Sequence, residues 1–217
     1  MKSYNKMVIH MLMAIIGISG RMGQRLYDYF KDRFEIVGID LINCSKVKTY
    51  KHLSDVKEKI DVVVDFSNTN AFDELCYALE NNILTLSGTT GYTDELLDEL
   101  KEKGSDLFYW SANYSKGIGL FSRLIKIIKN DYSLFDFIEI HASTKKDSPS
   151  GTAKMLARDL DISLDKIQSL RINHAPPIHE LIFSSENEQI AIRHEVTNTN
   201  AFLEGFDEVL TNLLGSD

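Results

Sequence analysis

A glycine-rich turn lies directly behind the first apolar run of this chain and restricts its fold more than any other feature. Residues 11–16 are all apolar, and residues 17–23 read Gly-Ile-Ser-Gly-Arg-Met-Gly. A continuous apolar run is typical of a strand that is covered on both faces of a parallel sheet. Glycines at a strand-to-helix turn let the backbone approach a pyrophosphate at the positive end of the helix. The turn therefore predicts a nucleotide-binding α/β fold. Its Gly-x-x-Gly-x-x-Gly spacing meets the usual motif only in part and leaves simple packing glycines as an alternative.

The segments that follow alternate between expected helices and expected strands. A helix over 24–31 and a strand over 34–39, which ends at Asp40, complete a βαβ unit. Further strands are expected at 61–66, 83–86 and 107–110, with helices at 71–82 and 94–103. This alternation predicts an α/β fold with a Rossmann-like parallel sheet.

The pattern changes near Asn113 and indicates a second, mixed α/β domain. We expect helices over 120–130, 150–160 and 202–214, and strands over 135–141, 181–184 and 189–195. Strand periodicity places Phe135, Phe137, Glu139 and His141 on one face.

Charge and hydropathy exclude several classes of protein. The net charge of −8 argues against a nucleic-acid binder, which needs a basic surface to neutralise phosphates. Residues 7–16 are mostly apolar, but His10 interrupts them and no small-residue cleavage site follows, which favours a buried strand over a signal peptide or a membrane span. We therefore expect a cytoplasmic protein that binds neither nucleic acid nor membrane.

Three segments of the first half are expected at the carboxyl ends of strands, where ligands bind in open α/β sheets. They are Asp40, the run Asp65-Phe66-Ser67 and the run Gly88-Thr89-Thr90-Gly91. Asp40 is suited to accept hydrogen bonds from a ribose 2′-hydroxyl, whereas Arg21 on the glycine turn would attract a 2′-phosphate. Ordinary turn chemistry is the alternative for the two runs.

A third group of residues combines a proton donor with an anion site. His141 ends a predicted strand, Lys145 follows in a loop, and a helix is expected to begin at Ser150-Gly151-Thr152. Histidine can donate a proton near neutral pH, while a lysine and a helix N-terminus both favour a carboxylate. Taken singly, Ser150 could be only an N-cap and His141 only a half-buried polar residue; together they predict an anionic substrate beside a proton donor. His174, His179 and His194 have no metal-ligand spacing, so no metal is expected.

These motifs together resemble the dihydrodipicolinate reductase family of lysine and diaminopimelate biosynthesis. The resemblance is carried by Gly20-Arg21-Met22-Gly23, Asp65-Phe66-Ser67, Gly88-Thr89-Thr90-Gly91, Ala112-Asn113-Tyr114-Ser115 and Glu139-Ile140-His141, and by Lys145-x-Asp147-x-Pro149-Ser150-Gly151-Thr152-Ala153. They occur in the family's order over nearly the whole chain, and the last motif is the most specific.

The resemblance implies reduction of 4-hydroxy-tetrahydrodipicolinate, a small dicarboxylate, by NADH or NADPH. It implies a dinucleotide-binding domain over 1–112 plus 203–217, and a substrate-binding and oligomerisation domain over 113–202 that builds a homotetramer. His141 and Lys145 would be catalytic, and Lys145, Ser150, Gly151 and Thr152 would bind the substrate. The cofactor would be lined by Gly17, Gly20, Arg21, Met22, Asp40, Phe66, Gly88, Thr90, Ala112 and Tyr114.

The chain departs from the family pattern at Ala142, where the family usually has a second histidine. Two other functions therefore stay open. One is a different Rossmann imine or amino-acid oxidoreductase with an altered substrate, and the other is a non-catalytic nicotinamide-binding protein. The presence of both His141 and Lys145 speaks against the latter, because a sensor needs no proton donor.

Overall fold

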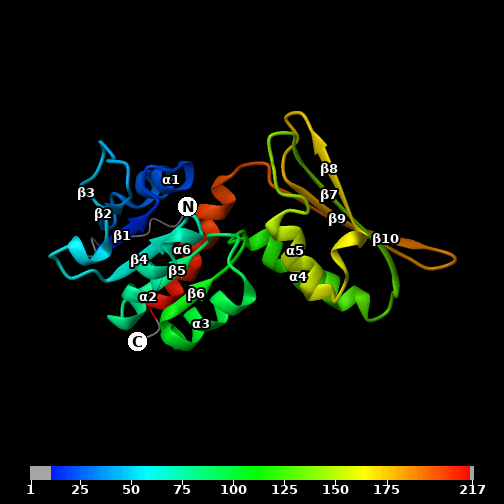
Figure 1. Cartoon of the computed structure of the whole chain (residues 1–217). Coiled ribbons are helices and arrows are strands. Elements are labelled where there is room, and N and C mark those ends of the chain that lie inside the picture. Colours follow the sequence, from blue (N-terminus) through cyan, green and yellow to red (C-terminus); the bar gives the residue numbers. More distant parts are fainter. Residues whose placement is uncertain (1–10, 216–217) are drawn as a thin grey trace. The chain divides into compact units, whose positions relative to one another are not determined.

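The computed structural model describes residues 11–215 and divides the chain into two compact units (Figure 1). The first unit ends at Ser111 and the second begins at Ala112, one residue from the expected boundary. The last helix is grouped with the second unit, so the assignment of 203–217 to the dinucleotide-binding domain stays a prediction. The start of the apolar run, residues 7–10, lies outside the described residues.

The first unit contains a six-stranded, fully parallel sheet in the order β3-β2-β1-β4-β5-β6. The order reverses beside β1, because the chain proceeds outward to β2 and β3 before it returns to β4 on the other side. Such a reversal is where open α/β sheets bind ligands, and it confirms the predicted Rossmann-like sheet. The strands are β1 (Leu12–Ile16), β2 (Glu35–Ile39), β3 (Thr49–Tyr50), β4 (Val62–Asp65), β5 (Leu84–Ser87) and β6 (Phe108–Trp110).

Three α-helices connect these strands: α1 (Arg21–Phe30), α2 (Phe72–Glu80) and α3 (Asp94–Gly104). The ends of α3 are set by its sequence. The Thr93 hydroxyl caps its N-terminus, acidic residues fill its first turn, and lysines fill its last turn, as the helix dipole favours. The apolar strands lie in a core that these helices cover, and β1 is buried along its whole length.

The second unit contains a four-stranded mixed sheet in the order β10-β9-β7-β8. β7 (Leu134–Ala142) is parallel to β8 (Ile167–Ile172) and antiparallel to β9 (Ile178–Ser184), which pairs in turn with β10 (Gln189–Glu195). The helices are α4 (Lys116–Lys129), α5 (Gly151–Leu160) and α6 (Asn200–Leu214). The prediction of a second, mixed α/β domain is thereby confirmed. Among the described residues, no helix is long and apolar enough to cross a membrane.

The two faces of β7 differ along its length, as strand periodicity predicts. Phe137, Glu139 and His141 are buried, whereas their neighbours are exposed or half-buried. Phe137 packs in an apolar cluster formed with α4 and α5. The covered face therefore changes from apolar to polar toward the end of β7, and this change places two titratable side chains in the interior.

Sequence periodicity missed two strands and the start of one helix. The strand β3 has only two residues, too few to show any period. In β8 the covered positions include Ser169 and Arg171, so the polar side chains hide the alternation that marks a half-buried strand. The helix α4 begins at Lys116, four residues earlier than expected, because its first turn contains two glycines.

Candidate active site

The turn between β1 and α1 can be built only from small residues at two of its positions. Gly17 has φ +77°, and a Cβ atom there would lie 2.8 Å from Cβ of Ser67. A Cβ atom on Gly23 would lie 2.2 Å from the carbonyl oxygen of Gly17, so α1 packs directly on the turn. The N-cap Gly20 provides no side-chain cap, and the first turn of α1 has no acidic residue. The N-terminus of α1 thus keeps its backbone donors and positive dipole for an anion, which fits a bound pyrophosphate.

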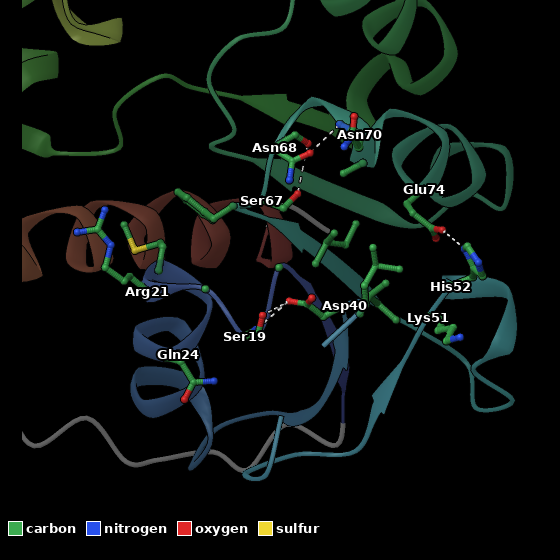
Figure 2. A pocket seen from close by; sticks show the side chains of 18 of the residues that line it. Ser19, Arg21, Gln24, Asp40, Lys51, His52, Ser67, Asn68, Asn70 and Glu74 are labelled. Atoms are coloured by element: carbon green, nitrogen blue, oxygen red, sulfur yellow. Dashed lines mark hydrogen bonds and ion pairs between the residues drawn. The ribbon is translucent and has the colours of Figure 1, made fainter. Parts of the chain in front are cut away.

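A pocket of about 1170 Å³ opens beside this turn (Figure 2). Its wall consists of the turn, the end of β2, the segment after β3 and the segment after β4. Six of the residues predicted to bind the cofactor line it: Gly17, Gly20, Arg21, Met22, Asp40 and Phe66. Sequence reasoning had not assigned the polar side chains of Ser19, Gln24, Lys51, His52, Asn68 and Asn70, which also line it. Ser19 lies within the glycine turn and Gln24 directly follows it, whereas Lys51, His52, Asn68 and Asn70 belong to no motif and reach this pocket through the fold.

Asp40 lies in the pocket wall, where hydrogen bonds from the protein occupy part of the accepting capacity of its carboxylate. Its Oδ2 accepts hydrogen bonds from Ser19 N (3.0 Å) and Ser19 Oγ (2.6 Å), and its Oδ1 accepts one from Ile42 N (3.0 Å). Partial burial raises the pKa of Asp40, but these hydrogen bonds outweigh it and hold the pKa below its usual value. In Figure 2 Arg21 lies on one side of Asp40, with Lys51 and His52 on the other.

The other predicted cofactor residues lie outside this pocket lining. Gly88 supports Phe66 from behind, since a Cβ atom on it would lie 2.0 Å from the Phe66 ring. Thr90 is exposed. Ala112 and Tyr114 belong to the second unit, where the buried Tyr114 ring packs edge-on against Phe206.

Asp65 is a buried residue that connects β4 to β5 through hydrogen bonds. It ends β4, is fully buried, and accepts hydrogen bonds from Ser67 N (3.0 Å), Ser67 Oγ (2.6 Å) and Ser87 Oγ (2.7 Å). Burial raises the pKa of this carboxyl despite those hydrogen bonds. The run Asp65-Phe66-Ser67 therefore has two parts: Phe66 and Ser67 line the pocket, while Asp65 ties β4 to β5.

In the second unit the buried carboxylate of Glu139 accepts hydrogen bonds from two elements, the N-terminus of α5 and strand β8. Its Oε1 accepts hydrogen bonds from Ser150 N (3.0 Å), Ser169 Oγ (2.8 Å) and Arg171 Nη2 (2.9 Å). Burial raises the pKa of Glu139, but His141 and these donors outweigh burial and bring the pKa far below its usual value. We call Glu139, Ser150, Ser169 and Arg171 the Glu139 network.

His141 lies at the edge of this network. Its Nδ1 is 3.3 Å from Oε2 of Glu139, within ion-pair distance but without the alignment of a hydrogen bond. The His179 ring lies edge-on to it, with 5.4 Å between the ring centroids. Burial, followed by the nearby His141, lowers the pKa of His179 to about 3. His179 is therefore neutral at physiological pH.

Lys145 and the start of α5 are already engaged with other protein groups. Lys145 Nζ is 2.8 Å from Asp147 Oδ1. Burial raises the pKa of Asp147, but its hydrogen bond from Lys145 outweighs this and lowers the pKa overall. Ser150 is the N-cap of α5: its Oγ accepts from Ala153 N at 3.1 Å, and its own N–H donates to Glu139. Thr152 Oγ1 accepts from Asn113 Nδ2 at 2.9 Å. A substrate carboxylate here would have to share or displace protein contacts.

Sequence reasoning missed three members of this site: Ser169, Arg171 and His179. Strand β8, which carries two of them, was not predicted, and His179 was considered only as a metal ligand. The group that the fold does bring together is Glu139, His141 and His179, whose ligand atoms all lie within 4.8 Å of one another. Because Glu139 is paired with Arg171, a cation here would meet an existing positive charge.

The fold and the two sites define a class: a Rossmann-type nucleotide-binding protein with a second α/β unit that carries a buried acid-histidine site. Comparison with known families narrows this class. "Dihydrodipicolinate reductase, N-terminus" matches residues 11–114, and "Dihydrodipicolinate reductase, C-terminus" matches residues 117–215. The chain belongs to the dihydrodipicolinate reductase family, and the resemblance noted from the sequence is confirmed.

Curated relatives extend over most of the chain. A protein of Rickettsia canadensis named 4-hydroxy-tetrahydrodipicolinate reductase is 34% identical over 214 residues, which covers 88% of both chains. A protein of the same name from Clostridium novyi is 29% identical over 220 residues and 87% of both chains.

Solved structures share the fold. A dipicolinate-bound dihydrodipicolinate reductase from Paenisporosarcina sp. TG-14 has a TM-score of 0.78 at 22% identity, covering 94% of this chain and 95% of its own. Aspartate dehydrogenase from Thermotoga maritima has a TM-score of 0.62 at 16% identity, covering 94% of this chain and 97% of its own.

Proposed function

We propose that this chain reduces 4-hydroxy-tetrahydrodipicolinate (dihydrodipicolinate) to tetrahydrodipicolinate with NADH or NADPH, in lysine and diaminopimelate biosynthesis. One observation carries the proposal: a chain of this family combines an open pyrophosphate turn at α1 with a buried His141 beside the Lys145-to-Thr152 loop. The curated relatives bear the name of this activity.

The residues present fit a dinucleotide. The turn at Gly17 and Gly23 excludes side chains where the backbone must approach a phosphate, and the N-terminus of α1 is uncapped. Asp40 offers an ionised carboxylate for ribose hydroxyls. When bound, the reduced nicotinamide supplies the hydride.

The second unit supplies charge and a proton. Lys145 and the first turn of α5 attract the dicarboxylate, since an ammonium group and helix-end N–H groups both stabilise carboxylates. His141 donates the proton that, together with the hydride, completes the two-electron reduction of the unsaturated ring. The Glu139 carboxylate faces this imidazole, with Oε2 3.3 Å from His141 Nδ1.

Oxidation of NADH and NADPH, measured at 340 nm with substrate freshly formed by a coupled synthase, tests this function. The wild type is expected to turn over, and His141→Gln should lose about 100-fold or more in kcat. No turnover by the wild type, or full activity in His141→Gln, would contradict the proposal. Turnover of other imines or amino acids alone would instead favour an oxidoreductase with an altered substrate.

The same assay tests Lys145 against Ala142. Lys145→Ala should lower kcat/KM about 100-fold, because it removes the charge expected to face a substrate carboxylate. Ala142→His should change it by less than about fivefold, since strand alternation turns residue 142 away from the face that carries His141. A larger effect at Ala142 than at Lys145 would reverse this assignment.

We further propose a homotetramer that works in the cytoplasm. The family resemblance supports both parts of this proposal. The open face of the second sheet, which exposes Leu170 and Ile172 at 46% and 49%, supports the assembly. Exposed apolar side chains grouped on one sheet face are typical of an interface.

A further inference from the structure

Arg171 connects the two segments that carry the proposed catalytic residues. It lies on β8 in register with His141 on β7. Its Nη2 donates to Glu139 Oε1 at 2.9 Å and to the carbonyl oxygen of Asp147 at 2.6 Å. Glu139 belongs to the strand that carries His141, and Asp147 belongs to the loop that carries Lys145. One guanidinium thus links the strand and the loop.

The Glu139 carboxylate also connects the N-terminus of α5 to these two segments. It accepts the N–H of Ser150, the residue that caps α5, and the hydroxyl of Ser169 on β8. The Glu139 network therefore joins β7, β8 and the N-terminus of α5. His179 on β9 and His194 on β10 lie beyond it: the ring centroids of His141 and His179 are 5.4 Å apart, and those of His179 and His194 are 6.3 Å apart.

We propose that Arg171 is a positioning residue of the reductase site, which holds His141 and the Lys145 loop in one fixed arrangement through Glu139 and the carbonyl of Asp147. Arg171 itself is not assigned a contact with substrate. The inference rests on the proposed function for the identity of the reaction, but its geometry belongs to this unit alone.

The two acceptors of Arg171, the Glu139 carboxylate and the Asp147 carbonyl oxygen, suit a guanidinium better than an ammonium group. A guanidinium presents several donors in a fixed plane, so it serves the carboxylate and the carbonyl at the same time, whereas a lysine presents one compact charge. Glu139 is 0% exposed, so removing Arg171 would leave a buried carboxylate without its counter-charge. Losing the bridge would also release the loop, and a displacement of about 1 Å at a reacting group can cost about 100-fold in rate.

The experiment compares Arg171→Met, Arg171→Lys and the double variant Glu139→Gln/Arg171→Met in the full chain. Three quantities are measured: the melting temperature, the Kd for dipicolinate as a dicarboxylate probe, and kcat with KM. Arg171→Met should lower kcat about 100-fold and weaken dipicolinate binding at least tenfold. Arg171→Lys should recover part of both losses, because it keeps the charge without the bridge.

The double variant separates positioning from stability. Neutralising both partners removes the unpaired buried charge, so the melting temperature should recover relative to Arg171→Met. Both kcat and dipicolinate affinity should stay low, because the link to Asp147 is still missing. Lys126→Met is the matched control: it removes an exposed ion pair to Asp159 in the same unit and should leave all three quantities nearly unchanged.

The outcomes distinguish this inference from the proposed function. If the double variant regains wild-type kcat and affinity together with its stability, or if Arg171→Met keeps both within twofold, the positioning role is overturned. A wild type that binds dipicolinate without reducing the substrate would contradict the proposed function, and the ratio of Kd values between the wild type and the Arg171 variants would then decide the positioning role. A wild type that does not bind dipicolinate would overturn both.

Discussion

Individual charged residues of this chain act through the partners that the fold gives them. Asp40, Asp65 and Glu139 are all carboxyl groups near strand ends, yet their pKa values move in different directions. Burial raises the pKa of Asp65, whereas hydrogen-bond donors outweigh burial at Asp40 and Glu139. The sequence identified Asp40 as a ligand residue from its place after a strand, but it could not show that Glu139 pairs with an arginine thirty-two positions later.

His179 should make folding stability depend on pH. The pKa of His179 is about 3 in the folded chain and about 6.5, the ordinary histidine value, in the unfolded chain. Between these two pH values the unfolded chain therefore binds a proton at His179 and the folded chain does not. This contribution to stability is present above about pH 6.5 and is lost as the pH falls toward 3. His179→Gln should flatten the slope of the unfolding free energy between pH 6 and 4 by up to about 1.4 kcal/mol per pH unit.

Urea unfolding at several pH values measures that slope. His174→Asn provides the control, because His174 is exposed and its φ of +59° suits asparagine. An unchanged slope in His179→Gln would show that His179 takes up its proton at an ordinary pH in the folded chain.

Asp40 should govern the choice between the two nicotinamide cofactors. Its ionised carboxylate favours ribose hydroxyls and repels a 2′-phosphate. Asp40→Asn should lower kcat/KM for NADH about tenfold, the loss expected for a hydrogen bond to a charged group, and should raise the NADPH-to-NADH ratio. Steady-state kinetics with both cofactors measure the ratio, and an unchanged ratio would point to Arg21, Lys51 or His52 as the discriminating residues.

At the level of elements, local patterns predicted the structure where periodicity is strong. The buried strands of the first sheet, the helix after the glycine turn and the N-cap at Ser150 all follow from local sequence. Strand β8 was missed because Ser169 and Arg171 face the covered side, and their polarity contradicts the rule that covered positions are apolar. Both residues belong to the Glu139 network. The prediction from sequence periodicity therefore failed at a strand whose polar side chains face the covered side for a functional reason, the binding of Glu139.

The contact between α1 and the glycine turn gives a prediction for an element. Gly23→Ala places a Cβ atom 2.2 Å from the carbonyl oxygen of Gly17, which must move α1 away from the turn. We expect NADH affinity to fall at least about tenfold and stability to fall by about 1–3 kcal/mol, as for other overpacked sites. Fluorescence titration with NADH and urea unfolding measure these effects.

Gly119→Ala in α4 is the matched control for Gly23→Ala. Apart from its chain neighbours and the backbone of its own helix, no described heavy atom lies within 4 Å of its added Cβ. A helical alanine there should therefore leave NADH affinity unchanged and add up to about 1 kcal/mol of stability. Equal effects of the two substitutions would mean that close packing on the turn has no special importance.

On the scale of the whole molecule, the helices described between residues 11 and 215 cover one face of the second sheet and leave side chains of its other face exposed. Helices α4 and α5 pack on the face that carries Phe137, while the other face exposes Leu170 and Ile172. The tetramer was predicted from the family resemblance alone. The exposed apolar face could not be predicted from the sequence pattern, because strand β8, which carries Leu170 and Ile172, was not predicted.

Leu170→Arg tests whether copies of the chain associate through this open face. A charge at the centre of an apolar interface is costly to bury, so the variant should form smaller assemblies than the wild type. Light scattering after size-exclusion chromatography measures the mass. If the wild type is a monomer, or if Leu170→Arg keeps the wild-type mass, this face does not carry the proposed assembly.

The boundary at Ser111 and Ala112 has a consequence for how such a chain can diversify. The described pocket beside the glycine turn is built wholly from the first unit, and the Glu139 network wholly from the second. Substitutions that change the preference between NADH and NADPH therefore need not alter the residues proposed to bind the substrate. The pocket and the Glu139 network can therefore be altered by separate substitutions within one polypeptide.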